Sequence, residues 1–100
     1  MDFNTEKLTL AARALSDPTR IRIIELLCKG DYCVNALTRF LKITQPAVSQ
    51  HLSILKQAGL VVPQKKGYYI HYSINTDVSK TLLKELANLF QKKGGKENVQ

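Results

Sequence analysis

The spacing of the apolar residues switches from a helical to a strand-like period at Gly59, and this switch constrains the fold of the chain more than any other feature. As far as Gly59, apolar residues recur every three or four positions, which is the period of an α-helix. From Leu60 to Ile74 they form a short apolar run and then an alternating run, as in β-strands. The helical spacing then returns. The sequence therefore predicts one mainly α domain that contains a β-hairpin.

Start and stop signals divide the helical stretches into separate predicted helices. Their approximate bounds are residues 5–15, 18–28, 34–41, 44–59 and 78–91. Pro18 starts the second helix, with Ser16 or Asp17 as its N-cap, while Thr44 caps the fourth helix and Asp77 the last. The apolar residues that recur at helical spacing are Leu8, Ala11, Ala12 and Leu15; Ile21, Ile24, Leu27 and Cys28; Leu37, Phe40 and Leu41; Val48, Leu52 and Leu55; and Val78, Leu82, Leu86 and either Leu89 or Phe90. Those of the second, third and fourth helices are predicted to be buried within the chain. The stripe Val78, Leu82, Leu86 and Leu89 is long for a single chain of this size to cover, so it is predicted to face a second copy together with Leu8, Ala12 and Leu15.

Two short strands, at about residues 60–62 and 68–74, make up the predicted hairpin. The link between them contains Lys65 and Lys66 and ends in Gly67. Because glycine favours a tight turn, the hairpin is predicted to have a cationic tip.

Charge is distributed unevenly along the chain. The sequence has 15 Lys and Arg against 8 Asp and Glu, which gives a formal net charge of +7. No acidic residue occurs between Asp31 and Asp77, whereas five cations lie there: Arg39, Lys42, Lys56, Lys65 and Lys66. A surface of one sign is typical of proteins that bind a polyanion. Nucleic acid is favoured over a membrane surface, because no basic amphipathic helix with exposed aromatic residues occurs.

Several classes of protein are excluded by what the sequence lacks. No apolar run approaches the ~18–20 residues that cross a bilayer, and the N-terminal residues do not form a signal peptide. The two cysteines are too few for a disulfide scaffold, which fits a reducing compartment. No catalytic Ser/His/Asp set, paired carboxylates or glycine-rich phosphate loop is recognisable. We expect a cytoplasmic protein, neither an enzyme nor a membrane protein, with one domain at residues 1–92 and a flexible polar tail at 93–100.

The order helix, short helix, tight turn, helix and β-hairpin is the plan of a winged helix-turn-helix protein. In this fold the helix after the turn enters a DNA major groove ~12 Å wide, so its exposed side needs small or hydrogen-bonding side chains. The predicted fourth helix supplies them at Thr44, Gln45, Ala47, Ser49, Gln50 and His51. On the hairpin, Lys65 and Lys66 are predicted to contact phosphates or the adjacent minor groove. Double-stranded DNA is therefore the predicted partner.

The aromatic residues of the hairpin divide into two groups. Tyr72 alternates in phase with two isoleucines and is predicted to face the core. Tyr68 and Tyr69 either contact DNA from the hairpin or have no such role, and Tyr68 is included among the predicted DNA contacts. A zinc site built from His51 and His71 is not predicted, because one belongs to the DNA-facing helix and the other to a strand.

Three segments of the chain carry a more specific signal: ALSDPTRIRIIELL, ITQPAVSQHLSILKQAGLV and KKGYYIHYSI. With these segments, which span about residues 11–74, the sequence resembles the ArsR/SmtB-type family of winged-helix repressors. The resemblance implies a homodimer formed through the first and last helices, and recognition of operator DNA by the segment from Thr44 to His51. It also implies that a metal or another effector lowers the affinity for DNA.

The metal sites of that family match this sequence incompletely. Many members carry a Cys-Val-Cys-Asp box whose thiolates bind arsenite, cadmium or lead, whereas residues 33–36 here are CVNA, so only Cys33 keeps a thiol. Other members bind zinc through Asp and His of the last helix, but residues 78–91 contain no His and Glu85 is their sole acid. No intact metal site is therefore predicted, and a soft metalloid, a metal or a thiol-reactive compound is the class of effector considered.

Each cysteine allows two interpretations. In the first, Cys33 senses the effector, and the break at residues 29–31 brings Cys28 close enough to act as second ligand or resolving thiol. In the second, Cys28 packs in the core and Cys33 is a small residue at a helix start.

The predicted function is a dimeric, sequence-specific transcriptional regulator that represses until such an effector releases it. The alternatives are a nucleic-acid-binding protein without sequence specificity and a winged-helix protein-interaction module.

Overall fold

The computed structural model describes residues 4–92 and residue 94 of the chain. Its elements, in chain order, are α1 (Thr5–Ala14), α2 (Pro18–Leu27), β1 (Tyr32–Cys33), α3 (Val34–Leu41), α4 (Gln45–Gln57), β2 (Val61–Lys66), β3 (Tyr69–Ile74) and α5 (Thr76–Phe90). The helices lie within two residues of their predicted bounds. The tail predicted over residues 93–100 lies, except for residue 94, outside the described residues.

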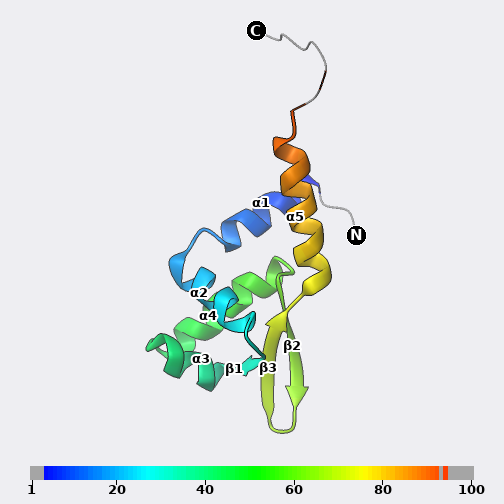
Figure 1. Cartoon of the computed structure of the whole chain (residues 1–100). Helices are drawn as coiled ribbons and strands as arrows, with labels where there is room; N and C mark the ends of the chain where they lie inside the picture. The colour runs from blue at the N-terminus through cyan, green and yellow to red at the C-terminus, as the bar shows by residue number, and fades with distance from the viewer. Residues whose placement is uncertain (1–3, 93, 95–100) are drawn as a thin grey trace.

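The α1–α5 pair and the hairpin lie at opposite ends of the structure (Figure 1). α1 packs against α5 at one end, and the hairpin of β2 and β3 projects at the other. Between them, α4 packs against α1, α2, α3 and β2. One hydrophobic core runs from the helices to the base of the hairpin. This arrangement confirms the predicted winged helix-turn-helix fold, mainly α with a β-hairpin wing.

The core differs from the prediction in α2 and α3. Ile23 is fully buried, whereas Ile21 is 40% exposed and Cys28, directly after α2, is also exposed. Phe40 of α3 is 50% exposed, and its ring meets the ring of Tyr32 edge-on with centroids 5.2 Å apart. The predicted burial of Ile21, Cys28 and Phe40 is therefore wrong. Because α2 carries aliphatic residues on several sides, their spacing alone does not identify the side that its neighbours cover.

The N-caps of α2 and α4 are confirmed, but that of α5 is not the predicted residue. The side chains of Asp17 and Thr44 each accept a hydrogen bond from the backbone N–H three residues further on. At α5, the side-chain oxygen of Asn75 accepts from the N–H of Val78 at 3.2 Å. Asp77 cannot be the cap because it already lies in the first helical turn, whereas Asn75 has an extended backbone.

The sheet has three strands where a two-stranded hairpin was predicted. β1 pairs antiparallel with β3, so the strand order is β1-β3-β2, with Tyr32 opposite Tyr72 and Cys33 opposite His71. A strand of two residues is too short to show the alternation by which strands are recognised in a sequence. Because α3 begins directly after β1, this pairing attaches the start of α3 to the hairpin.

The hairpin also turns later than predicted. β2 continues to Lys66, which pairs with Tyr69, so Gly67 and Tyr68 form the turn. Gly67 has a φ of +66°, and glycine with positive φ at the first of two turn residues is the type II′ pattern. The predicted cationic tip is therefore wrong: Lys65 and Lys66 lie on the strand before the turn, and Tyr68 lies at the tip.

Candidate nucleic-acid interface

A compact turn joins α3 to α4. Lys42 ends α3 in the left-handed conformation with a φ of 57°, and its backbone N–H donates to the carbonyl of Thr38 at 2.8 Å. Ile43 packs against the core, and Thr44 begins α4. Glycine or asparagine usually marks a left-handed residue, so the lysine at this position did not predict the geometry of the turn.

α4 has a buried side and an exposed side. Val48, Leu52 and Leu55 are at most 1% exposed and hold the helix against the core. Five of the predicted DNA contacts lie outside this buried side, on the helix or at its cap. Four of them are exposed, Thr44, Gln45, Ser49 and Gln50, and Ala47 is half-buried. Amide and hydroxyl groups can both donate to and accept from the edges of bases. The exposed side of α4 is therefore chemically suited to the role predicted for it.

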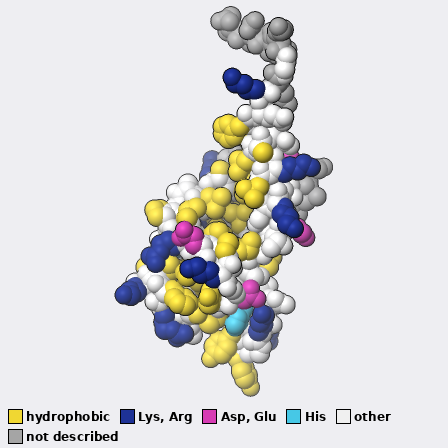
Figure 2. All heavy atoms as spheres, viewed as in Figure 1, with side chains coloured by type: hydrophobic (Ala, Val, Ile, Leu, Met, Phe, Trp, Pro, Cys, Tyr) yellow, Lys and Arg dark blue, Asp and Glu magenta, His cyan; other side chains and the backbone are white. Residues whose placement is uncertain are grey.

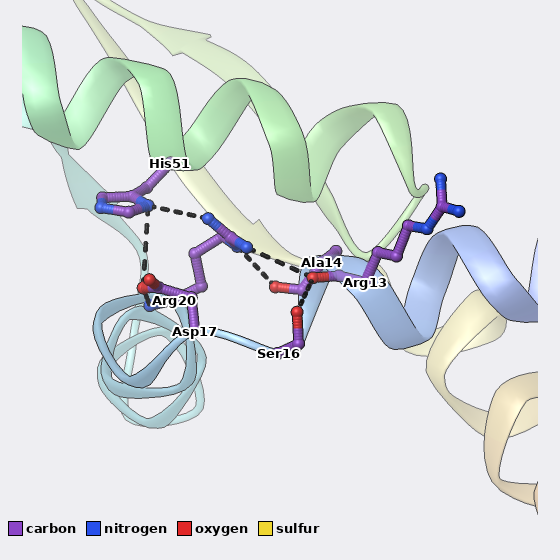
Figure 3. A network of polar contacts seen from close by, with 6 residues as sticks. All are labelled: Arg13, Ala14, Ser16, Asp17, Arg20 and His51. Atoms are coloured by element: carbon purple, nitrogen blue, oxygen red, sulfur yellow. Dashed lines mark hydrogen bonds and ion pairs between the residues drawn. The ribbon is translucent and has the colours of Figure 1, made fainter.

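His51 is placed differently from the other predicted contacts, because it turns toward the start of α2 (Figure 3). Its side chain is 22% exposed, and its Nδ1 lies 3.2 Å from Nη1 of Arg20 and 3.9 Å from Oδ2 of Asp17. Neither Arg20 nor the approach of Asp17 could be predicted from the sequence, since no local pattern relates residues so far apart in the chain. Folding brings the carboxylate of Asp17 beside a segment that itself contains no acid.

The carboxylate of Asp17 is held in its charged form. The hydrogen bond from the backbone N–H of Arg20 lowers the pKa of Asp17 below its ordinary value of 3.8, and the positive charge of Arg20 acts in the same direction against desolvation. A pKa that is lower in the folded than in the unfolded protein means that ionised Asp17 stabilises the fold above the ordinary value. This contribution is lost as the pH falls through the folded-state pKa.

Asp17→Asn provides a test of this pH dependence. Asparagine keeps a side-chain oxygen that can cap α2 but removes the charge, so the variant should unfold more easily than the parent protein at neutral pH. The difference in free energy of unfolding should shrink steadily as the pH falls below the ordinary pKa of Asp17. Urea unfolding of both proteins across this pH range measures it. A difference that does not change with pH would show that the charge of Asp17 has no such effect.

On the hairpin, the two predicted lysine contacts are not equivalent. Nζ of Lys66 lies 3.0 Å from Oδ2 of Asp31 in an exposed ion pair, so this lysine already has an acidic partner from the loop before β1. Lys65 is exposed and forms no ion pair with the residues that the structure describes. Tyr68 is 99% exposed and Tyr69 is 56% exposed, and Figure 2 shows hydrophobic atoms at this end of the molecule. Since an exposed ion pair contributes only about 0–1 kcal/mol, a phosphate could replace Asp31 as the partner of Lys66.

The two cysteines are free and lie in different surroundings. Cys28 is exposed after the last residue of α2, where it lines a hollow along that helix, so its predicted packing role is wrong. Cys33 is half-buried directly before α3 and lines another hollow, of about 230 Å³, together with Gln45 of α4 and Tyr68 of the hairpin tip. Within residues 4–92 and 94, no group of three or more His, Cys, Asp and Glu lies together in a way that could hold a metal ion.

α1 and α5 leave apolar side chains uncovered at their end of the molecule. Leu83 is 67% exposed, Leu89 61% and Phe90 80%. Figure 2 shows hydrophobic side chains along this part of the surface. Leu8 of α1 and Leu89 of α5 line the same hollow, so the exposed apolar surface involves both helices.

Part of the surface predicted to face a partner subunit is instead core. Val78 and Leu82 are 4% and 7% exposed, because elements of the same chain cover them. Toward the end of α5 this cover is lost: Leu86 is half-buried and the apolar residues after it are exposed. Any partner on α5 would therefore meet its second half. Within residues 4–92 and 94, every helix is too short or too polar to span a lipid bilayer.

Sequence comparisons relate the chain to bacterial regulators. The family model described as bacterial regulatory protein, arsR family, matches residues 17–62. The chain is 39% identical over 80 residues to the transcriptional repressor SdpR of Bacillus subtilis (strain 168), covering 80% of this chain and 89% of that protein. It is also 39% identical over 84 residues to the arsenical resistance operon repressor of the same organism, covering 82% and 80%.

A structural comparison agrees with the sequence comparisons. The fold is similar to the homodimeric winged helix-turn-helix DNA-binding domain of a possible ArsR-family transcriptional regulator from Mycobacterium bovis. The TM-score is 0.72 at 25% identity, covering 84% of this chain and 79% of that one. The family match at residues 17–62 contains α2, α3 and α4, and hence the complete helix-turn-helix. The chain belongs to the ArsR family of bacterial regulatory proteins.

Proposed function

We propose that this regulator acts in the cytoplasm as a homodimeric repressor that binds an operator in double-stranded DNA through α4. The observation that carries the proposal is the exposed side of α4, where Gln45, Ser49 and Gln50 present hydrogen-bonding groups on a helix that contains no acid. The opposite side of α4 is fixed in the core, so these groups are held in a defined geometry. Glutamine can pair with adenine through two hydrogen bonds, which gives sequence preference.

A homodimer supplies the second half of the recognition surface. The exposed apolar residues of α5, Leu83, Leu89 and Phe90, offer a surface that a second copy of the chain would cover. The similar domain from Mycobacterium bovis is homodimeric, which supports the same assembly here. Two-fold symmetry would place the two α4 helices about one DNA turn apart, ~34 Å, so the operator should be an imperfect palindrome.

Binding to DNA upstream of candidate target genes tests this proposal. Nuclease footprinting should protect a site with two-fold symmetry, and unlabelled random DNA should compete much less well than the site itself. Equal competition would favour the alternative of a protein that binds nucleic acid without sequence preference. Failure to bind either DNA would favour a winged-helix module that binds proteins. Both outcomes would contradict the proposal.

We further propose that the repressor senses its signal through Cys33. This thiol lies directly before α3 and shares a hollow with Gln45 of α4 and Tyr68 of the hairpin, so a bound group would touch both parts that face DNA. A relative of the chain is an arsenical resistance operon repressor, which supports a soft metalloid as the signal. A coupling free energy of about 1–3 kcal/mol between the thiol and the DNA site would be sufficient for release.

The Cys33→Ser variant is expected to stay on DNA when the parent protein is released. Serine removes the thiolate that soft metalloids and oxidants attack but keeps the size of the side chain. The concentration of arsenite or peroxide that releases half of the DNA should rise at least about tenfold. Cys28→Ser is the matched control, because Cys28 lines a different hollow and should change release less. Equal release of parent and Cys33→Ser, or release of neither, would contradict the sensing role.

A further inference from the structure

One arginine joins three helices at the edge of α4. The guanidinium of Arg20, in α2, donates from Nε to the carbonyl of Ala14 at 2.6 Å and from Nη2 to the carbonyl of Arg13 at 3.2 Å, both at the end of α1. Its Nη1 lies 3.2 Å from Nδ1 of His51 in α4. Figure 3 shows the guanidinium between the end of α1 and the imidazole.

We infer that Arg20 is a positioning residue for DNA recognition, which holds His51 in the tautomer that offers an Nε2–H donor to DNA. The inference rests on the proposed function, because it adds one group to the surface of α4 that faces the operator. It also explains why His51 can contribute to that surface although most of its side chain is buried.

The tautomer follows from the chemistry of the two groups. A guanidinium can only donate hydrogen bonds, so in its 3.2 Å contact with Nη1 of Arg20 the Nδ1 of His51 accepts and carries no proton. The carboxylate of Asp17 lies 3.9 Å from Nδ1, too far to accept a hydrogen bond from it. The single proton of the neutral imidazole is therefore on Nε2. In Figure 3 this second ring nitrogen points away from Arg20 and Asp17.

The Nε2–H of His51, on the side of the ring away from Arg20, is able to donate to an acceptor on DNA. The hydrogen bonds of the described residues give His51 a partner at Nδ1 and none at Nε2, while 22% of the side chain is exposed. A phosphate oxygen or a base acceptor of the operator fits this position. Because Arg20 is itself fixed by two backbone carbonyls of α1, it also limits the movement of α4 relative to α1.

Nitrogen-15 NMR of the imidazoles tests the tautomer in the protein without DNA. In the parent protein at a pH where His51 is neutral, its Nδ1 should have the shift of an unprotonated, hydrogen-bonded nitrogen and Nε2 that of a protonated one. In Arg20→Gln the two shifts should move toward each other, as the tautomers begin to exchange. A proton on Nδ1, or shifts that are the same in parent and variant, would overturn the inference.

Measurements of DNA binding distinguish the positioning role of Arg20 from the effect of losing its positive charge. Arg20→Gln and Arg22→Gln each remove one cation from α2, and Arg22 is exposed. Both variants should lose the same affinity for random DNA, while Arg20→Gln should lose about tenfold more affinity for the operator, the value of one charge-assisted hydrogen bond. Equal losses on the operator would overturn the inference.

His51→Asn covers the case in which Arg20→Gln does not fold. The Asn side-chain oxygen can take the place of Nδ1 and accept from Arg20, but the shorter side chain has no donor at the position of Nε2–H. This variant should therefore keep the melting temperature of the parent and lose about tenfold in operator affinity. Operator binding equal to that of the parent would overturn the inference. If the unmodified protein does not prefer an operator over random DNA, the proposed function fails, whereas the NMR result still decides the tautomer.

Discussion

The Gln50→Ala variant is expected to bind its operator about 1–3 kcal/mol more weakly than the parent protein, with little change in binding to random DNA. Gln50 is exposed on α4 and has no place in the core, so its loss should remove base contacts without affecting the fold. Gln45→Ala should behave in the same way, because Gln45 is exposed at the start of the helix. Fluorescence anisotropy with operator and random duplexes of equal length measures both affinities. The expected effect is a loss of specificity as well as of affinity.

The hairpin provides the matched control. Lys65→Ala should weaken binding to operator and random DNA alike and lower the slope of log affinity against log salt by about one, since a phosphate contact carries no sequence information. Lys66→Ala should weaken binding to both DNAs in the same way but by less, because Lys66 forms an ion pair with Asp31 in the parent protein. If Gln50→Ala reduced binding to both DNAs equally, the assignment of α4 as the recognition helix would be wrong.

Leu89→Glu is expected to raise the dissociation constant of the homodimer about 100-fold or more. In an interface with two-fold symmetry the substitution occurs twice, and each new carboxylate would lose water without gaining a partner. Leu89 is 61% exposed in the single chain, so the fold of the protomer should not depend on it. Sedimentation velocity across a range of protein concentrations measures the change. Operator binding should fall with it, because a monomer contacts one half-site.

Ile21→Glu is the control for the dimer. Ile21 is 40% exposed on α2, which is not one of the helices proposed to form the interface, and the change from an aliphatic side chain to glutamate is nearly the same. This variant should sediment as the parent protein does. A dimer of unchanged stability in Leu89→Glu would place the interface elsewhere on the molecule.

Strong local signals account for the parts of the fold that the sequence predicted. Thr44 as a cap, Pro46 in the first turn and Gly59 after the helix determine the ends of α4, because each acts through its own backbone or a neighbour. β1 was missed because its two residues become a strand only by pairing with β3. The prediction of Asp77 as the cap of α5 was wrong because Asp and Asn are both suitable caps, and the residue that takes this position, Asn75, lies only two positions earlier.

The candidate site likewise contains contacts that could be predicted from the sequence and contacts that could not. The exposed side of α4 could be predicted because helical spacing separates it from the buried residues. The contact of His51 with Arg20, and the ion pair of Lys66 with Asp31, join residues that lie far apart in the sequence. Such pairs are brought together only when helices and strands pack against one another, so neither the apolar periodicity nor the composition predicts them.

The central position of β3 has a consequence for how the chain acquires its structure during synthesis. β1 precedes α3, but the strand with which it pairs, β3, follows α4, so a nascent chain that has emerged through α4 holds the complete helix-turn-helix while β3 is still missing. Closing the intervening loop is an entropic cost that must be met before Tyr32 can pair with Tyr72. A chain that ends before β3 therefore lacks the attachment at the start of α3. The helix-turn-helix reaches its final geometry only after β3 has been made.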